Sequence, residues 1–391
     1  MSDIYGRLGL RPLINARGSH TRLGGSIMPA EVLDAMREAA QTYIVLEELQ
    51  EKASEVIARA TGAEAGMVTG GAAAGLILGT AACIAGSDPA SIERLPDTSG
   101  MKGDVVMHRA HRNGYDHSVR AAGARIVEAG YGHGTIPYQL EAAIGEQTAL
   151  VFYVMAPWAS KGALSLRKTC EIAHRKGVPV MVDAAAMLPP AENLTRIIAD
   201  GADLVVYSGG KGIRGPQSSG ILAGRADLVR AAAMNGSPNH SIGRPAKAAR
   251  EDIVGLIVAL ERFMALDHDA ELARCRAQAE FMLGKLGDFP GVEAHYRHDG
   301  YEHPMPRVEL VIDRAETGIE AGELIGALEQ GDPRVFVIAW NGPTASPNNI
   351  TINTHTMLPG EEDAVAEVIG HALRQRLNAN APALAGSVAS L

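Results

Sequence analysis

A short apolar segment that runs into a glycine-rich loop constrains this chain more than any other feature. Residues 204–207 read Leu-Val-Val-Tyr, and such apolar, largely β-branched and aromatic residues are typical of a buried strand. The loop that follows has small residues on both sides of Lys211. An ordinary lysine is a solvated surface charge, but glycines around this amine would let a ligand approach it closely. The segment therefore predicts a functional lysine at the carboxyl end of a strand.

A second apolar segment, residues 178–182, ends on Asp183, which precedes Lys211 by 28 residues (211 − 183). This spacing accommodates one short helix and one strand, so it is typical of a βαβ unit. Two parallel strands would then present Asp183 and Lys211 at one carboxyl edge, where open α/β sheets bind ligands. A desolvated amine can form a Schiff base with a carbonyl, and a carboxylate can hold a pyridine nitrogen protonated. The pair indicates pyridoxal 5'-phosphate.

The phosphate of this cofactor needs hydrogen-bond donors. Residues 67–75 pass from a short strand through Gly70 and Gly71 into a helix rich in alanine and leucine. The free N–H groups and the dipole at the start of such a helix favour an anion. A Gly-Gly turn before a helix is also common where it only connects two elements and binds no ligand. Ser208, three residues before Lys211, offers a hydroxyl to the same group.

The cofactor ring needs a flat partner, which we expect just after the strand at residues 104–108. We favour His111 over His108 for this position. Together with His117 and His133, these histidines also raise the alternative of a metal site. They lack a two-histidine helical spacing and a carboxylate placed to complete a site, so we expect no metal.

The order of strands and helices predicts an α/β fold with a mainly parallel, doubly wound seven-stranded sheet and a smaller C-terminal α+β domain. The expected domain division is residues 1–50, 51–260 and 261–391. The strands expected in the sheet are residues 67–69, 105–108, 125–128, 149–155, 179–183, 204–207 and 220–223. Those expected in the C-terminal domain are residues 292–296, 307–312, 335–340 and 349–353. Residues 231–250 of the large domain read as a loop.

These motifs carry a resemblance that extends over residues 11–362. The chain resembles the fold-type I pyridoxal-phosphate enzymes, and among them the selenocysteine synthase-like family, which also contains D-glucosaminate-6-phosphate ammonia-lyase. The most specific motifs are Leu23-Gly24-Gly25-Ser26, Thr61-Gly62-Ala63-Glu64-Ala65, Ser208-Gly209-Gly210-Lys211, Arg214-Gly215-Pro216-Gln217 and Ile242-Gly243-Arg244-Pro245.

The resemblance implies a role for each matching residue. Lys211 would be the Schiff-base lysine and Asp183 the partner of the pyridine nitrogen. The backbone of Gly71, Ala72 and Ala73, together with Ser208, would bind the phosphate. One departure is Ala186, which stands where cysteine desulfurases place a glutamine against the cofactor ring.

Several cationic or amide side chains are candidates for binding the substrate. An arginine suits this role because its guanidinium binds a carboxylate through two hydrogen bonds. Arg17 replaces a small residue that the family pattern leads us to expect, and Arg334 competes with Arg307. A structural role in the lysine loop, or a surface role, is an equal alternative for several of them. The candidates are Arg17, Arg214, Gln217, Arg244 and Arg307.

Composition bears on partners and location. The net charge of −9 provides no general basic field for a polyanion, which disfavours tRNA as a substrate. An odd number of cysteines, three, without a CxxC pair is typical of a reducing cytoplasm. No apolar stretch is long enough to cross a membrane. The resemblance and the loop at residues 241–245 predict a homodimer or a higher homo-oligomer.

The reaction is predicted from the lysine amine and from the resemblance. In any such enzyme the lysine amine is the natural base for the substrate Cα–H. The resemblance favours a lyase that performs α,β-elimination on a β-hydroxy amino acid or an amino sugar acid and yields a 2-keto acid. An amino-acid racemase or epimerase is the nearest alternative, and a selenocysteine synthase-like transferase is another.

Overall fold

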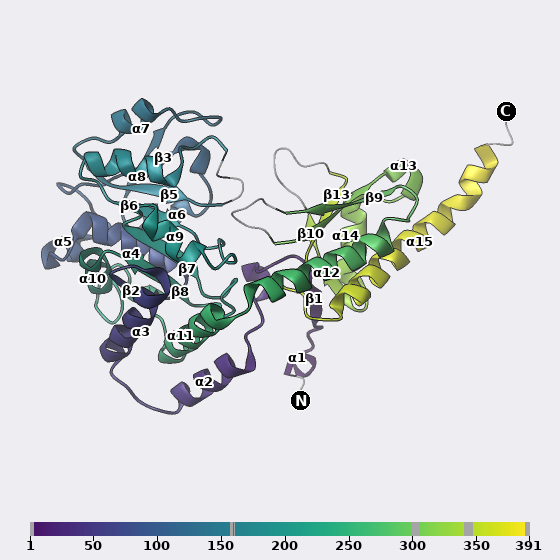
Figure 1. The fold of residues 1–391 in the computed structure, drawn as a ribbon, viewed down its shortest axis with the longest axis horizontal. Coiled ribbons are helices and arrows are strands. Elements are labelled where there is room, and N and C mark those ends of the chain that lie inside the picture. The colour runs from purple at the N-terminus through teal and green to yellow at the C-terminus, as the bar shows by residue number, and fades with distance from the viewer. Residues whose placement is uncertain (1–3, 157–158, 160, 299–304, 340–346, 388–391) are drawn as a thin grey trace. The chain divides into compact units, whose positions relative to one another are not determined.

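The computed structural model describes residues 4–156, 159, 161–298, 305–339 and 347–387, without the side chains of residues 378–387 (Figure 1). The contacts divide the chain into a large unit, Gly25–Leu266, and a C-terminal unit that combines Met1–Gly24 with Asp267–Leu391. The first 24 residues thus group with the C-terminal part, whereas we predicted that residues 1–50 form a segment of their own.

The large unit is built on a seven-stranded sheet with the strand order β2-β8-β7-β6-β5-β3-β4. Only β8 runs antiparallel to its neighbours, and the other pairs are parallel. The mainly parallel seven-stranded sheet predicted from the sequence is therefore confirmed. The strands are β2 (Ala65–Thr69), β3 (Asp104–His108), β4 (Arg125–Ala129), β5 (Thr148–Val154), β6 (Val180–Asp183), β7 (Leu204–Ser208) and β8 (Gly220–Gly224).

The central strands β5, β6 and β7 are buried on both faces, which explains why they are continuous apolar runs, whereas the edge strand β4 exposes Arg125 and Glu128. Along β5, Val151 and Tyr153 belong to one hydrophobic cluster, while Leu150 and Phe152 belong to the other. The helices of the unit are α2 (Ala30–Ala40), α3 (Leu46–Thr61), α4 (Ala72–Ala85), α5 (Pro89–Arg94), α6 (Asp116–Ala121), α7 (Pro137–Ala143), α8 (Leu166–Arg175), α9 (Asn193–Ala199), α10 (Ala226–Met234) and α11 (Arg250–Ala265).

Helix α10 corrects one expectation. Residues 231–250 were predicted to be a loop, which is wrong for residues 231–234, because α10 continues to Met234. Ala231 and Ala232 are buried and the helix packs on α4, and it ends directly before Asn235-Gly236, a pair typical of a helix end. A short 3-10 helix, η3 (Arg244–Ala246), interrupts the remaining loop.

The C-terminal unit contains a four-stranded antiparallel sheet with the order β12-β13-β10-β9, and a separate parallel pair of β1 and β11. The strand predicted at residues 335–340 is divided between these two sheets, and Trp340 lies outside the described residues. The elements are α1 (Ile4–Arg7), β1 (Leu13–Asn15), η1 (Thr21–Leu23), α12 (His268–Leu286), β9 (Val292–Arg297), β10 (Arg307–Ile312), α13 (Arg314–Thr317), α14 (Ala321–Gln330), β11 (Arg334–Phe336), β12 (Ile338–Ala339), β13 (Asn349–Asn353) and α15 (Glu361–Ser387). Among the described residues, no helix has the length and apolar character that crossing a membrane requires.

Candidate functional site

The carboxyl ends of the central strands bring the predicted residues of the large unit to one edge of the sheet. Asp183 ends β6, where it pairs with Val154 of β5 and Val206 of β7. Strand β7 continues to Ser208, which pairs with Gly220 at the start of β8. Gly220 in turn pairs with the last residue of β2. Because β8 runs antiparallel, its first residue joins the last residues of its neighbours at this edge.

Asp183 and Lys211 interact electrostatically in a buried environment. The side chain of Asp183 is only 8% exposed, and burial raises the pKa of its carboxyl group. The backbone N–H of Ala185, 3.0 Å from Oδ1, and the charge of Lys211 act in the opposite direction. Burial lowers the pKa of the Lys211 amine, and the charge of Asp183 raises it. The structure therefore brings together the carboxylate and the amine that the sequence paired by spacing.

The loop that carries Lys211 is held by backbone hydrogen bonds. Ser26 donates from its hydroxyl to the Lys211 carbonyl at 2.7 Å and from its N–H to the Gly210 carbonyl at 3.0 Å. The N–H of Arg214 also donates to the Lys211 carbonyl, at 3.0 Å, and Arg214 adopts a positive φ of 59°. These bonds fix the backbone on both sides of the amine. The sequence analysis missed this role of Ser26, although its motif was among those quoted for the resemblance.

The glycines of this loop are required by its own packing. A Cβ at Gly210 would lie 2.5 Å from Gln217 Cα, and one at Gly212 would lie 2.5 Å from the carbonyl carbon of Leu188. At Gly209, a Cβ would meet the side chain of Ser219. Packing is therefore one reason for glycine at these positions, and the room for a ligand that we expected beside Lys211 stays a prediction.

Four of the predicted phosphate-binding residues lie at the same edge. We call them the anion cradle: Gly71, Ala72, Ala73 and Ser208. Helix α4 begins at Ala72 and has no side-chain cap, and its first turn is free to offer N–H groups to an anion. Gly71 adopts a φ of 104°, and a Cβ built on it would meet nothing within 4 Å, so open space faces the start of the helix. The free N–H groups, the open space and the Ser208 hydroxyl fit the phosphate of pyridoxal phosphate.

Gly220 packs closely against the backbone of the anion cradle. A Cβ at Gly220 would lie 2.5 Å from the carbonyl carbon of Gly71 and 2.7 Å from the nitrogen of Ala72. On the adjacent strand, Thr69 donates from its hydroxyl to the Gly71 carbonyl at 2.9 Å. The sequence analysis placed a strand at residues 220–223 but did not identify this contact, because it depends on the antiparallel insertion of β8 between β2 and β7.

The two candidate histidines occupy different positions. His108 is fully buried, with its ring nitrogens 3.1 Å from the hydroxyls of Thr135 and Thr169, and burial lowers its pKa to about 4. The Nδ1 of His111 accepts a hydrogen bond from the N–H of Val154 at 3.2 Å. His111 is thus held by the backbone at the carboxyl end of β5.

The ring of His111 also belongs to an aromatic group. It makes edge contacts with Tyr153 and His108, at centroid distances of 4.5 and 4.9 Å. Burial, followed by the influence of His108, lowers the pKa of His111 to about 3, so the ring is neutral at physiological pH. A neutral aromatic ring suits stacking against a cofactor ring.

The candidate substrate residues separate into two sets. Arg214 and Gln217 belong to the loop of Lys211, and Arg244 lies exposed in η3. A Cβ at Gly70 would lie 2.7 Å from the carbonyl oxygen of Ala246, so η3 ends beside the loop that leads into α4. The structure thus brings these three residues to the same part of the large unit.

The other two candidates, Arg17 and Arg307, belong to the C-terminal unit. Arg17 follows β1, and its N–H donates to Asn15 Oδ1 at 3.0 Å. Arg307 begins β10 and pairs with Asn353 of β13. Its competitor Arg334 donates to the Glu329 carbonyl at 2.8 Å and lies over the Phe336 ring. The role of these arginines stays a prediction.

Comparison with known proteins adds to this geometry. The family model described as SelA, L-seryl-tRNA selenium transferase, matches residues 13–271. The chain belongs to this family. It is 34% identical to D-glucosaminate-6-phosphate ammonia lyase of Salmonella typhimurium, over 85% of this chain and 89% of the relative. It is also 32% identical to 5'-C-glycyluridine monooxygenase-decarboxylase of a Streptomyces species, over 85% of this chain and 83% of the relative.

Solved structures agree with the family assignment. The structure of a D-glucosaminate-6-phosphate ammonia-lyase superposes with a TM-score of 0.84 at 31% identity, covering 96% of this chain and all of that one. A serine palmitoyltransferase of Sphingomonas wittichii superposes with a TM-score of 0.59 at 14% identity, covering 94% of this chain and 88% of that one, which shows the fold alone. The predicted fold-type I architecture, the cofactor pyridoxal phosphate and the enzyme class of a lyase are confirmed.

Proposed function

We propose that this pyridoxal-phosphate enzyme catalyses α,β-elimination on a β-hydroxy amino acid or an amino sugar acid. The substrate would lose its Cα proton and its β-hydroxyl group as water, and hydrolysis of the resulting enamine would release ammonia and a 2-keto acid. The observation that carries this proposal is the interaction of half-buried Lys211 with buried Asp183, in a chain 34% identical to D-glucosaminate-6-phosphate ammonia lyase.

The site residues would hold the cofactor by three of its groups. When bound, pyridoxal phosphate supplies an electron sink that acidifies the Cα–H of an amino acid. The carboxylate of Asp183 would hold a proton at the pyridine nitrogen, and its burial strengthens this hydrogen bond. The anion cradle would bind the phosphate, and the ring of His111, held at the carboxyl end of β5, would lie against the cofactor ring.

Lys211 would act as the base. Burial lowers the pKa of its amine, so a larger fraction of the amine is neutral near pH 7 than for an exposed lysine. A neutral amine at the strand end can take the Cα proton and then deliver it to the departing β-hydroxyl group. The hydrogen bonds of Ser26 and Arg214 to the Lys211 carbonyl would keep the amine in position.

Substrate recognition would depend on cations near the site. Arg214 and Arg244 are suited to bind the carboxylate or another acidic group of the substrate, and Gln217 to bind a hydroxyl group. Arg17 and Arg307 remain candidates from the C-terminal unit. The net charge of −9 supports a small-molecule substrate rather than a nucleic acid.

We also propose that the protein forms a homodimer or a higher homo-oligomer in the cytoplasm. Exposed apolar side chains concentrate in residues 27–45, where the consecutive residues Tyr43, Ile44 and Val45 are 94%, 51% and 53% exposed. Such a surface is typical of an interface between subunits. The cytoplasmic location is supported by three cysteines that are free thiols in the structure.

The experiment that tests the reaction follows a panel of D- and L-amino acids and amino sugar acids, including D-glucosaminate 6-phosphate, in deuterium oxide. We expect keto acid and ammonia in equal amounts, with deuterium at Cβ of the product, as read by NMR and mass spectrometry. Exchange at Cα with inversion and no keto acid would instead establish racemisation. Oxygen consumption with release of carbon dioxide would favour the chemistry named for the Streptomyces relative.

A further inference from the structure

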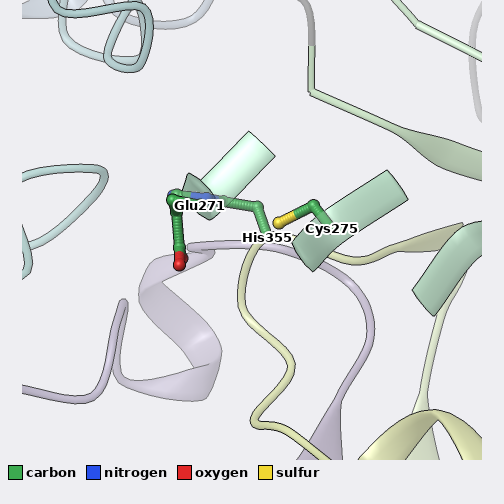
Figure 2. Close-up of side chains that lie close together, drawn as sticks. All are labelled: Glu271, Cys275 and His355. Atoms are coloured by element: carbon green, nitrogen blue, oxygen red, sulfur yellow. The ribbon is translucent and has the colours of Figure 1, made fainter. Parts of the chain in front are cut away.

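The C-terminal unit contains a cluster of metal-ligating side chains, none of which is among the cofactor-binding residues assigned in the large unit. Glu271 and Cys275 lie on α12, and His355 follows β13 (Figure 2). One carboxylate oxygen, the thiol sulfur and one imidazole nitrogen all lie within 4.8 Å of one another. We predicted no metal from the sequence, having considered only the histidines at residues 108–133.

Local structure explains why these side chains meet. Glu271 and Cys275 are four residues apart in a helix, so they share one face of α12. The loop that carries His355 is fixed on both sides, since Thr354 donates from its hydroxyl to the Pro306 carbonyl at 2.8 Å and Thr356 donates from its hydroxyl to the Asn15 carbonyl at 2.8 Å. Cys275 is fully buried and Glu271 is partly exposed, so the cluster lies just below the surface of its unit.

We propose that Glu271, Cys275 and His355 bind a divalent transition-metal cation of the zinc type. Thiolate, imidazole and carboxylate are the ligands that zinc prefers, and a soft thiolate disfavours magnesium and calcium. Zinc bonds of about 2.0 to 2.3 Å place tetrahedral ligand atoms roughly 3.3 to 3.8 Å apart, so the three atoms need to close by about 1 Å. Because Glu271 is 20% exposed, a water molecule can reach the fourth position.

Arg274 already provides a positive charge at this place. Its guanidinium binds both carboxylate oxygens of Glu271, at 2.7 and 3.0 Å, and Nη2 lies 3.4 Å from the sulfur of Cys275. A metal ion would replace it at these two ligands, while Arg274 kept its hydrogen bonds to Gln278 at 2.8 Å and to the Met357 carbonyl at 3.3 Å. Arg274 is therefore a competitor of the metal, and metal binding would release the thiol proton of Cys275.

The test uses the full-length holoenzyme after metal removal. Calorimetric titration with zinc, in two buffers that differ in ionisation enthalpy, measures the affinity and the number of protons released. Titration with cobalt(II) reports the geometry through its visible bands on the red side of the cofactor absorption. We expect one ion bound per chain at this site, about one proton released, and the intense bands of a tetrahedral cobalt–thiolate site.

Matched variants assign the site. Cys275→Ser and His355→Gln should each weaken zinc binding by at least about tenfold, since even changes beyond the ligands cost that much. Arg274→Gln should tighten it, an effect that a purely structural role of Arg274 does not predict. Cys83→Ser removes a thiol in the large unit and should leave binding unchanged. The cofactor absorbance of each variant shows that it is folded.

Three results would overturn the proposal. The first is equal zinc affinity of the wild type and Cys275→Ser, and the second is a weak octahedral cobalt spectrum. The third is unchanged or weaker binding by a folded Arg274→Gln variant. If Cys275→Ser fails to fold, the zinc affinity of His355→Gln tests the proposal. Glutamine keeps hydrogen-bonding groups at this position but lacks the imidazole nitrogen that would bind zinc.

Discussion

At the scale of single residues, the amine of Lys211 and the carboxylate of Asp183 set each other's charge. Burial favours the neutral form of both groups, and their mutual attraction favours the charged forms. This opposition keeps an amine available as a base next to a carboxylate that can hold a proton on a bound ring.

Replacing Lys211 by alanine should abolish the covalent attachment of the cofactor and lower the elimination rate by a factor of at least about 1,000, because the variant lacks both the attached amine and the proposed base. The attachment is measured by borohydride reduction followed by peptide mass spectrometry. Lys176→Ala, at an exposed lysine, is the control. A Lys211→Ala protein that still carries the reduced cofactor would contradict the assignment.

The pKa of Lys211 can be measured in the cofactor-free protein by competitive acetylation across a pH series. Since burial lowers this pKa, the midpoint for Lys211 should fall below about 10.4, the ordinary value for a lysine. The charge of Asp183 raises the same pKa, so Asp183→Asn should move the midpoint to a still lower pH. A midpoint that rises in Asp183→Asn, or does not move, would show that the two groups do not interact.

At the scale of elements, the edge of the sheet is assembled by strand register. The antiparallel strand β8 places Gly220 directly against the start of α4 and beside Ser208. The anion cradle thus depends on the absence of a side chain on a strand that does not itself contact the proposed ligand.

Gly220→Ala should weaken pyridoxal phosphate binding by at least about tenfold, or about 1.4 kcal/mol. The added Cβ would lie 2.5 Å from the carbonyl carbon of Gly71, and backbone cannot move away as cheaply as the end of a side chain. The dissociation constant is measured by titrating the cofactor-free protein and following absorbance. Gly145→Ala is the matched control, because a Cβ there meets nothing within 4 Å. Equal losses in the two variants would refute the supporting role of Gly220.

The end of β3 carries a pH-dependent contribution to stability. Burial lowers the pKa of His108 to about 4, so the folded protein keeps this ring neutral at pH values where the unfolded chain binds a proton. The contribution of His108 is therefore intact above about pH 6.5 and is lost as the pH falls toward 4. At pH 5 the loss is about 2 kcal/mol (1.5 pH units at about 1.36 kcal/mol each).

His108→Gln keeps polar contacts for Thr135 and Thr169 but cannot titrate. The fall in its free energy of unfolding between pH 7 and pH 5 should be about 2 kcal/mol smaller than in the wild type, as measured by urea unfolding. His133→Gln, at an exposed position, is the control for the loss of a histidine. If the free energy of unfolding of the variant had the same pH dependence as that of the wild type, His108 would not be the source of the pH-dependent contribution to stability.

At the scale of the whole molecule, the exposed apolar residues between α2 and α3 are difficult to explain in a monomer. Light scattering of the wild type should give a mass of at least twice 41.0 kDa. The double variant Tyr43→Asp/Ile44→Asp should raise the dissociation constant of the oligomer at least about tenfold, because it places charges in the apolar contact. Tyr138→Asp, at an exposed tyrosine on α7, is the control. A wild type that is monomeric under active conditions would refute the proposed assembly.

Several features of this protein could be predicted from the sequence because they depend on local patterns. The central strands of the large sheet are apolar runs bounded by glycine or polar residues, and the spacing between Asp183 and Lys211 is that of one βαβ unit. Since parallel strands end at one edge, the spacing alone predicted that the carboxylate and the amine meet.

Tertiary structure decided what depends on contacts between distant segments. His108 contacts the hydroxyls of Thr135 and Thr169, whereas His111 is held by the backbone at the end of β5, and the sequence shows neither contact. The contacts that require glycine in the lysine loop, such as that of Gly212 with Leu188, likewise depend on the tertiary structure. Cys275 and His355 are 80 residues apart (355 − 275), and α12 and the loop after β13 bring them together without any shared motif. Sequence periodicity reports which face of an element is buried, whereas the neighbours on that face are set by the long-range packing of the chain.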